Sequence, residues 1–450
     1  MVEILVSVPV DSSGPGAATV AFLDDTAEQV AFALERGRAI PHAEFRDDIS
    51  ALAAALPAQG AMVNLCEDRY QFLVAFAAAL ARGHAVLLPG SRAPEQVAEV
   101  AARHEHAYRC DDARALARGK VRHPLPTTLP ASQVAAYGYT SGSTGVPKRH
   151  AKRWGAFVAT TRLNAARIRE VLASNGAHGR PQIVATVPPQ HMYGLETSVL
   201  LPLVGGMSVH AGRPLFPGDV AAALAEMPEP RVLVTTPVHL RALVQSGVAM
   251  PRIALALSAT APLPLELARE AERALGAPIL ELYGATETCV VATRRTANDE
   301  PWRAYDGVTL EPKPDGVLVH APWLEAPTPL LDLVELLPGH RFVLRGRNAD
   351  LLEIAGKRAS LSELTRRLLA IDGVEDAVVF QPDGDGPVQR VAALVVAPAH
   401  LASATILARL RDVVDPAFLP RPLVRVAALP RNEVGKLPRE CLVAALRDAT

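Results

Sequence analysis

A strand-like run that opens into small hydroxyl residues, two glycines and a lysine constrains this chain more than any other stretch. It covers residues 137–148 and reads YGYTSGSTGVPK. Gly142 and Gly145 permit backbone conformations closed to residues with a Cβ, so successive N–H groups can converge on one anion. Lys148 adds a mobile positive charge. The pattern predicts a phosphate-binding loop with the donors Thr140, Ser141, Gly142, Ser143, Thr144, Gly145 and Lys148.

Two other interpretations of this stretch are open. Ser/Gly-rich composition is typical of flexible linkers, but Val134 to Tyr139 is apolar and aromatic enough for a buried strand, and Trp154 to Val171 has the pattern of a helix. The P-loop pattern requires four residues between its glycines and a lysine directly after the second. Here two residues separate the glycines, and Val146-Pro147 precede Lys148. A phosphate loop of another kind is therefore the better interpretation.

The length and segment pattern predict an α/β protein with more than one domain. A chain of 450 residues exceeds one ordinary domain. From Ile49 to Tyr283, short apolar runs alternate with helical patterns, one of which covers Pro94–Ala102. This alternation indicates two doubly wound sheets. From Val308 onward, short strands separated by Pro and Gly predict a small β-barrel-like sheet. We expect a large domain over residues 1–347 and a small, mobile α+β domain over residues 348–450.

Charge and cysteine usage limit the location and the partners. The formal net charge of -1 gives no global argument for nucleic acid or an anionic membrane surface. Four cysteines without CxxC spacing fit a reducing compartment. Glu3 replaces the basic start of a signal peptide, and Arg82 interrupts the most apolar stretch. We expect a soluble, cytoplasmic protein that binds neither nucleic acid nor membranes.

The segment YTSGSTGVPK resembles the signature loop of the AMP-forming adenylating enzymes, the superfamily of acyl-CoA and aryl-CoA synthetases, adenylation domains and firefly luciferase. Other motifs follow in the family's order over essentially the whole chain. They are Pro188–Gly194, Leu257–Leu263, Glu281–Glu287, Asp332 with Arg347, and Leu429–Arg439. The chain departs from the family at Arg149, where Gly is usual, and at Ala349, where Asp is common. The resemblance implies a hinge near Asn348–Asp350.

The resemblance assigns a nucleotide and a metal ion to named residues. It implies that Thr286 contacts the α-phosphate of ATP and that Glu287 binds Mg²⁺, for which a carboxylate is a suitable hard ligand. Without the resemblance, a Glu after Thr is more typical of a helix N-terminus, and an Asp–Arg pair can be a surface salt bridge. The further nucleotide-binding candidates are Ser258, Ala259 and Thr260 beneath the adenine, Glu281, Leu282 and Tyr283, and Asp332 with Arg347 at the ribose. Ser258, Ala259 and Thr260 stand where glycines are usual in the resembling family.

The resemblance also assigns the acid pocket and the mobile catalytic lysine. His191 would line the pocket, although a lone His near prolines is usually structural. Lys436, which by default would be solvated, would swing into the site and stabilise charge during acyl-adenylate formation. Gly356 would line a channel for a thiol. Glu363, three residues after Ser360, makes a helix-capping signature with it. The acid-pocket candidates are His191, Tyr193, Gly194, Gly284 and Ala285, and the catalytic candidates are Lys148, His191, Thr286, Glu287 and Lys436.

The expected activity is a two-step ligation. ATP would convert a carboxylic acid, of which a hydroxybenzoate-like aromatic acid is favoured, to acyl-AMP, and a phosphopantetheine thiol would then displace AMP. The chain is similar to free-standing ligases that load aryl acids onto acyl carrier proteins in aryl-polyene pathways. Arginines that could meet an acidic carrier protein, or be merely solvated, are Arg358, Arg366, Arg367, Arg421 and Arg425. The alternatives are a ligase that uses free CoA and a non-catalytic nucleotide-binding module.

Overall fold

The computed structural model describes residues 18–90, 92–117, 119–140, 148–347, 351–354, 357–382, 390–432 and 435–449. The predicted phosphate-loop residues Ser141–Gly145, the predicted hinge Asn348–Asp350 and Gly356 therefore lie outside the described residues. The fold is mixed α/β with two large sheets, which confirms the predicted fold class. Within the described residues, no helix is long and apolar enough to cross a bilayer.

A five-stranded sheet, in the order β6-β4-β5-β8-β9, carries the strand that leads into the phosphate loop. Its first four members are parallel, and β9 runs antiparallel to β8. The strands are β4 (Ala61–Asn64), β5 (Ala85–Leu88), β6 (Tyr108–Cys110), β8 (Val134–Thr140) and β9 (Lys148–Arg153). The associated helices are α1 (His42–Ala55), α2 (Arg69–Ala81), α3 (Pro94–Ala102), α4 (Asp112–Leu116) and α5 (Trp154–Ser174). The sequence predicted α3 and the start of α5 but gave no sign of β9.

An eleven-stranded sheet forms the other layer, in the order β20-β21-β16-β15-β14-β13-β12-β10-β11-β2-β3. The stretch from β2 to β14 is parallel, and the β15, β16, β20 and β21 end is antiparallel. The central strands are β10 (Gln182–Ala185), β11 (Ser208–His210), β12 (Arg231–Thr235), β13 (Leu255–Ser258), β14 (Ile279–Ala285) and β15 (Cys289–Arg294). The outer strands are β2 (Ala31–Glu35), β3 (Arg38–Pro41), β16 (Trp302–Ala304), β20 (Asp332–Leu337) and β21 (Arg341–Arg347).

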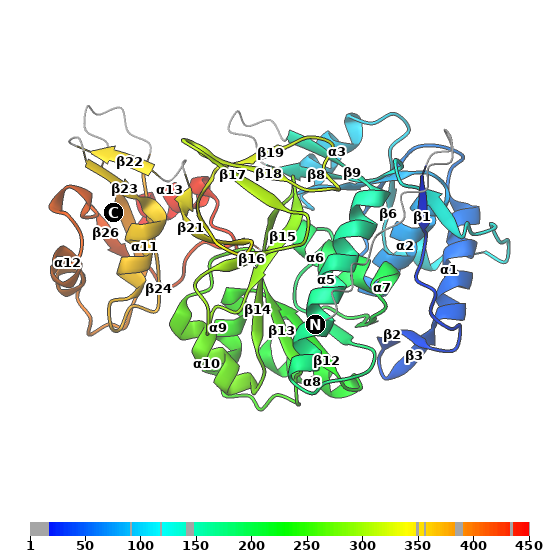
Figure 1. Ribbon diagram of the computed structural model, residues 1–450, viewed down its shortest axis with the longest axis horizontal. Helices are drawn as coiled ribbons and strands as arrows, with labels where there is room; N and C mark the ends of the chain where they lie inside the picture. The colour runs from blue at the N-terminus through cyan, green and yellow to red at the C-terminus, as the bar shows by residue number, and fades with distance from the viewer. Residues whose placement is uncertain are drawn as a thin grey trace.

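Helices cover the large sheet because each presents an apolar stripe to it. Leu224, Leu240 and Ala268 pack with the strand residues Leu233 and Ile279 in one cluster. The corresponding helices lie together beside β13 and β14 (Figure 1). They are α8 (Pro217–Glu226), α9 (Pro237–Ser246) and α10 (Leu265–Leu275). A short segment of α6 (Met192–Leu195), a π-helix (Glu196–Leu200) and α7 (Leu201–Val204) follows β10.

Two smaller sheets complete the part before residue 348. β17 (Thr309–Lys313), β18 (Gly316–His320) and β19 (Thr328–Leu330) form an antiparallel three-stranded sheet, and β1 (Thr19–Ala21) pairs with β7 (Thr128–Pro130). We expected the strands near residues 331–344 to join the small sheet. They extend the eleven-stranded sheet instead, because β21 pairs with β16.

The described residues after β21 gather at one end of the molecule (Figure 1). They have their own apolar cluster, which includes Leu364, Leu368 and Leu410. The Glu363 N–H donates to Ser360 Oγ at 3.4 Å, which confirms the predicted cap of α11. A separate cluster agrees with two domains, but the boundary at residue 347 remains a prediction. The elements are β22 (Leu351–Ile354), β23 (Lys357–Ser360), α11 (Leu361–Leu369), β24 (Asp376–Phe380), β25 (Ala392–Val396), α12 (Ser403–Arg411), a 3-10 turn (Pro416–Phe418), β26 (Leu423–Arg425) and α13 (Arg439–Asp448).

Candidate active site

The flanks of the predicted phosphate loop lie side by side. Thr140 at the end of β8 pairs with Lys148 at the start of β9. Ligands of parallel α/β sheets bind beyond the carboxyl ends of the strands, and Thr140 marks that end of β8. The loop donors Ser141, Gly142, Ser143, Thr144 and Gly145 lie outside the described residues, so their part in the site remains a prediction.

The turn between β14 and β15, residues 286–288, is named here the site turn. Thr286 and Glu287 belong to it, so the helix N-terminus that Glu287 alone would suggest is wrong. The Ala285 N–H donates to Thr288 Oγ1 at 3.1 Å and closes the turn. A Cβ on Gly138 of β8 would lie 2.8 Å from Thr286 Cγ2. The two sheets therefore bring the site turn against the strand that leads into the phosphate loop.

The Glu287 carboxylate faces β9. Its Oε1 lies 3.3 Å from His150 Nε2, and its side chain is 28% exposed. Burial lowers the pKa of His150; Glu287 opposes this, and the charges of Lys152 and Lys148 add to it. Among the described residues, no group of three or more His, Cys, Asp or Glu side chains could hold a metal ion. Mg²⁺ in phosphate sites is usually bound by one or two carboxylates together with substrate phosphates, so a single exposed carboxylate fits it.

His191 lies at the start of α6, within reach of several cations. The pKa of His191 is lowered to about 4, first by burial and then by the charges of Lys436, Arg213 and Arg92. Lys436, from the far end of the chain, is thus close to the predicted acid pocket. A Cβ on Gly435 would lie 3.3 Å from Val238 Cγ2, so the segment before Lys436 packs on α9.

The other acid-pocket candidates have roles inside the protein. The Tyr193 hydroxyl donates to the Thr235 carbonyl at 3.0 Å. A Cβ on Gly194 would lie 2.0 Å from the Pro188 carbonyl oxygen, so only glycine fits. A Cβ on Gly284 would lie 2.2 Å from the Cys289 carbonyl oxygen. The close approach of β15 accounts for this glycine, which is exposed, and its part in the acid pocket remains a prediction. Ala285, beside it, is half-buried.

The predicted adenine segment follows β13. The hydroxyl of Ser258 is buried and has no hydrogen-bond partner among the described residues. Ala259 is buried, and Thr260 has φ +81°. A β-branched residue with positive φ is rare, and such strain clusters at functional sites. Thr260 therefore keeps a backbone conformation suited to the glycine that is usual in the resembling family.

Residues 281–283 of β14, before the site turn, make their side-chain contacts inside the protein. The Glu281 carboxylate accepts from Arg294 Nε at 2.7 Å and from the Leu263 N–H at 3.2 Å. Leu282 is buried, and the ring of Tyr283 packs against aromatic side chains of β16 and β21. Any nucleotide contact from this segment would thus come from its backbone, while Glu281 ties the adenine segment to β14.

The predicted ribose pair is placed by strand register. Asp332, at the start of β20, is directly opposite Arg347, at the end of β21. Asp332 is buried, whereas the side chain of Arg347 lies outside the described set. The register brings these residues together as the spacing suggested. Their contact with a ribose remains a prediction.

Three residues near the site turn were not indicated by the sequence. His150 and Lys152 belong to a basic run, KRHAKR, that is typical of a solvated strand. Glu196 lies in the otherwise apolar region that follows Gly194, and this isolated charge was the one available signal. Lys152 and Glu196 are only 5% and 2% exposed. Sequence alone does not reveal which charges of a basic strand become buried.

The carboxyl end of β8, which leads towards the predicted phosphate loop, lies against the turn after β14 that carries the Glu287 carboxylate. The two large sheets thus meet at the kind of edge where α/β proteins bind their ligands. Residues 89–311 match the family described as AMP-binding enzyme. The matched residues form an AMP-binding enzyme domain. Relatives of this chain include CoA ligases, and the solved structures that share its fold include acyl- and aryl-CoA synthetases. The resemblance to the AMP-forming adenylating enzymes found in the sequence is confirmed.

Relatives and solved structures agree with this class. The chain is 31% identical over 273 residues to a 4-coumarate–CoA ligase of Rhodobacter capsulatus, covering 60% of this chain and 65% of that enzyme. It is 29% identical to a 4-coumarate–CoA ligase of Halorhodospira halophila, covering 66% and 73%. The chain thus spans just under two thirds of the first relative. ATP-bound MatB from Rhodopseudomonas palustris superposes with a TM-score of 0.77 at 19% identity over 94% of this chain and 97% of that chain, which shows the shared fold.

Proposed function

We propose that this protein activates an aromatic carboxylic acid, of the hydroxybenzoate type, with ATP and transfers the acyl group to a phosphopantetheine thiol. The observation that carries the proposal is that candidate residues from distant parts of the chain lie close together. Thr286 of the site turn packs on Gly138 of the phosphate-loop strand, and Lys436 is close enough to His191 to lower its pKa. The 4-coumarate–CoA ligase relatives support an aromatic acid.

In the first step, a carboxylate oxygen attacks the α-phosphorus of ATP. A new O–P bond forms, the bond from the α-phosphorus to the bridging oxygen breaks, and pyrophosphate leaves. The phosphate loop and Lys148 bind the phosphates, Thr286 donates to the α-phosphate, and Lys436 stabilises charge between acid and phosphate. Glu287 would hold Mg²⁺, which when bound neutralises charge on the phosphates. The protein positions the reactants and compensates their charge.

His191 is expected to act as a neutral pocket wall. Because its pKa is lowered to about 4, the imidazole carries no charge near pH 7. A neutral ring can pack against an aromatic acid or form one hydrogen bond to it. Tyr193, Gly194, Gly284 and Ala285 would shape the surrounding wall.

In the second step, the thiol sulfur attacks the acyl carbon and AMP leaves. Lys436 and the thiol cannot occupy the same approach, so the small domain would rotate between the steps. The contacts near the base of that domain suit the first step. Arg241 of α9 lies 3.4 Å from Asp376 of β24, and these contacts must break before rotation.

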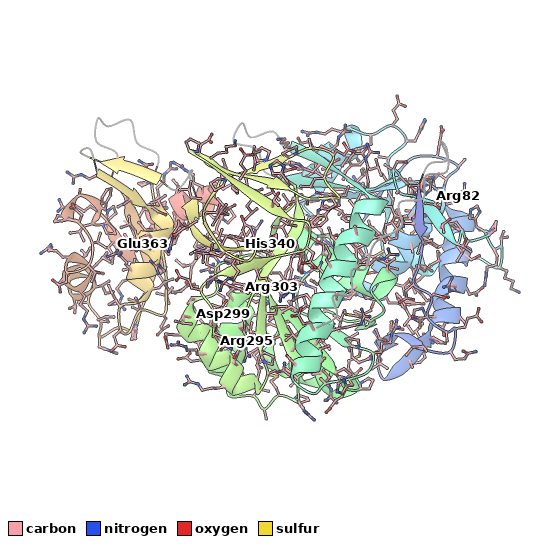
Figure 2. The ribbon with its side chains drawn as sticks, viewed as in Figure 1. Arg82, Arg295, Asp299, Arg303, His340 and Glu363 are labelled. Carbon is pink, nitrogen blue, oxygen red and sulfur yellow. The ribbon has the colours of Figure 1, made fainter. Side chains whose placement is uncertain are left out.

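The thiol carrier is proposed to be an acyl carrier protein, with free CoA as the second candidate. Arg366 and Arg367 on α11 are exposed but pair with Glu363, a residue labelled in Figure 2. Arg425 donates to backbone carbonyls of residues 397–399. These partners reduce the free positive charge offered to an acidic protein, whereas the CoA ligase relatives fit CoA. Turnover with holo-carrier protein and with CoA should be compared, and efficient turnover with CoA alone would contradict the preferred acceptor.

Pyrophosphate release over a panel of acids tests the activation step. We expect release with benzoates or 4-coumarate, ATP and Mg²⁺, and none without acid. Silence with every acid, together with intact ATP binding, would favour a non-catalytic nucleotide-binding module.

The proposed cytoplasmic location rests on cysteine usage, since Cys66, Cys110, Cys289 and Cys441 form no disulfide in the described part of the chain.

A further inference from the structure

Two buried charged side chains hold the site turn from different elements. Lys152 of β9 donates from Nζ to the carbonyl oxygen of Glu287 at 2.6 Å. Glu196, the first residue of the π-helix after α6, accepts at Oε2 from the Val290 N–H at 3.1 Å. These two residues are 5% and 2% exposed. The backbone on both sides of Thr288 is thus fixed by an ammonium and by a carboxylate.

Burying both charges is costly unless they are compensated. An ion removed from water loses several kcal/mol of hydration, which hydrogen bonds and an opposite charge must offset. Burial raises the pKa of Glu196 to about 7, while the Val290 N–H, the charge of Lys152 and the side chain of Asn164 lower it. The charge of Lys152 therefore favours the ionised form of Glu196 against the cost of its burial. The site turn is therefore supported by charged groups and not by apolar packing alone.

The geometry separates the backbone of the turn from its functional side chain. The Trp323 indole N–H donates to the Thr288 carbonyl at 2.9 Å, and Thr288 Oγ1 accepts from Ala285. With Lys152 and Glu196, these contacts fix residues on both sides of Thr288. The Glu287 carboxylate itself remains partly exposed beside His150. A fixed backbone with an accessible carboxylate is the arrangement that an outer layer of contacts gives to a metal ligand.

We propose that Lys152 and Glu196 are positioning residues that set the backbone of the site turn for Glu287 and Thr286. The inference rests on the proposed function, because the purpose of the turn is to present these two side chains to the phosphates. Lys152 and Glu196 need not touch ATP or the acid. Their effect is transmitted through the Glu287 carbonyl and the Val290 amide.

Four variants separate positioning from general stability. Lys152→Met removes the ammonium, and Glu196→Ala removes the acceptor. Glu196→Gln keeps an oxygen that can accept from Val290. Glu272→Gln is the matched control, because Glu272 Oε1 accepts from the Ile279 N–H at 2.8 Å at the other end of β14 and pairs with Arg295, labelled in Figure 2.

Hydrogen exchange on the protein without metal or nucleotide measures the turn directly. We expect Lys152→Met and Glu196→Ala to speed exchange in peptides covering residues 283–291 by about tenfold, the cost of one lost hydrogen bond to a charged group. Glu196→Gln should stay within about threefold of the parent, and Glu272→Gln should leave these peptides unchanged. A fluorescent ATP analogue then reports the Mg²⁺ half-saturation, which should rise about 10- to 100-fold in the first two variants.

The two measurements distinguish the inference from the proposed function. Parental exchange and parental Mg²⁺ half-saturation in folded Lys152→Met and Glu196→Ala would overturn the positioning role. Equal loosening of the turn by Glu272→Gln would overturn it as well. If those variants do not fold, Glu196→Asp keeps the charge but shortens its reach to Val290, and exchange in that variant decides. Failure of the parent to bind Mg²⁺ and ATP would overturn the proposed function, while the exchange result would still test the positioning.

Discussion

Gly138 is a residue at which the two sheets approach each other closely in the candidate site. It is on β8, two residues before the end of that strand, and Thr286 of the site turn occupies the space where a side chain would be. The sequence drew attention to the glycines of the phosphate loop but not to this one. A glycine in a strand often marks a close approach, and only the position of the second sheet identifies what approaches.

Gly138→Ala should therefore displace Thr286. The added Cβ would lie 2.8 Å from Thr286 Cγ2, so the Thr286 side chain, or the turn that carries it, must shift. We expect acyl-AMP formation to fall by about tenfold or more, because small displacements of positioning groups are costly in catalysis. Pyrophosphate release and thermal unfolding are the measurements. Gly218→Ala of α8, where an added Cβ would meet no atom within 4 Å, is the control and should leave pyrophosphate release unchanged without lowering the unfolding temperature.

Lys436→Ala should separate binding from chemistry. ATP binding should stay nearly intact, and acyl-AMP formation should fall by about 10²- to 10³-fold, the usual effect of removing one charge-stabilising donor. The pKa of His191 should rise toward its ordinary value, because one of the cations that lower it is gone. Histidine NMR titration measures this shift. Full adenylation activity, or an unchanged His191 pKa, would remove Lys436 from the site.

At the scale of elements, β24 and α9 connect the Lys436 segment to the large sheet. Asp376 of β24 accepts from Arg431 Nη2 at 2.9 Å, and Arg431 Nη1 donates to the carbonyl of Gly435, the residue before Lys436, at 2.9 Å. Asp376 also pairs with Arg241 of α9. The sequence identified the motif around Lys436 but not its partner Asp376, which lies 55 residues from Arg431.

Asp376→Asn should weaken this connection. Loss of the carboxylate charge weakens its pairs with Arg431 and Arg241, both partly exposed, so an effect of about 2- to 5-fold is reasonable. The first step should slow more than thiol transfer from acyl-AMP supplied in advance, because only the first step needs Lys436 in place. Single-turnover kinetics of each half-reaction measure the difference. Equal slowing of both steps would indicate a loss of stability instead.

Helices and strands could be predicted where the local sequence pattern is enough to specify them. The helix expected from residue 94 to 102 is α3, because Pro at its start and an apolar stripe specify it locally. β9 was missed because its residues are mostly polar and its strand character comes from pairing with β8. The site turn could not be distinguished from a helix start for the same reason. Its conformation is set by β15 returning along β14.

At the scale of the whole molecule, buried neutral histidines link stability to pH. His42 is 2% exposed and accepts at Nε2 from Arg180 at 2.9 Å. Burial lowers the pKa of His42 to about 4, against Asp24, which raises it. The unfolded chain binds a proton at about pH 6.5, whereas the folded chain does so only near pH 4. Stability from this group is therefore complete above pH 6.5 and is lost as pH falls toward 4.

The free energy of unfolding should therefore decrease as the pH falls. We expect His42 to contribute a decrease on the order of 3 kcal/mol between pH 7 and pH 4, at 1.36 kcal/mol for each pH unit of difference. Urea unfolding at several pH values measures it. Carboxylates titrate in the same range, so His42→Gln is the reference, and its stability should depend less steeply on pH. Identical slopes for the two proteins would contradict the assignment.

The sequence by itself determined the class of fold and the class of chemistry. Phosphate loops, caps and the Lys436 motif are short contiguous patterns, and their chemistry is carried by residues close together in the chain. Only the tertiary structure decided which charges support the site. Lys152 is 135 residues from Glu287, and Glu196 is 94 residues from Val290. The burial of such charges depends on how distant segments pack, because the desolvation cost of each charge is offset only by the partner that the fold places next to it.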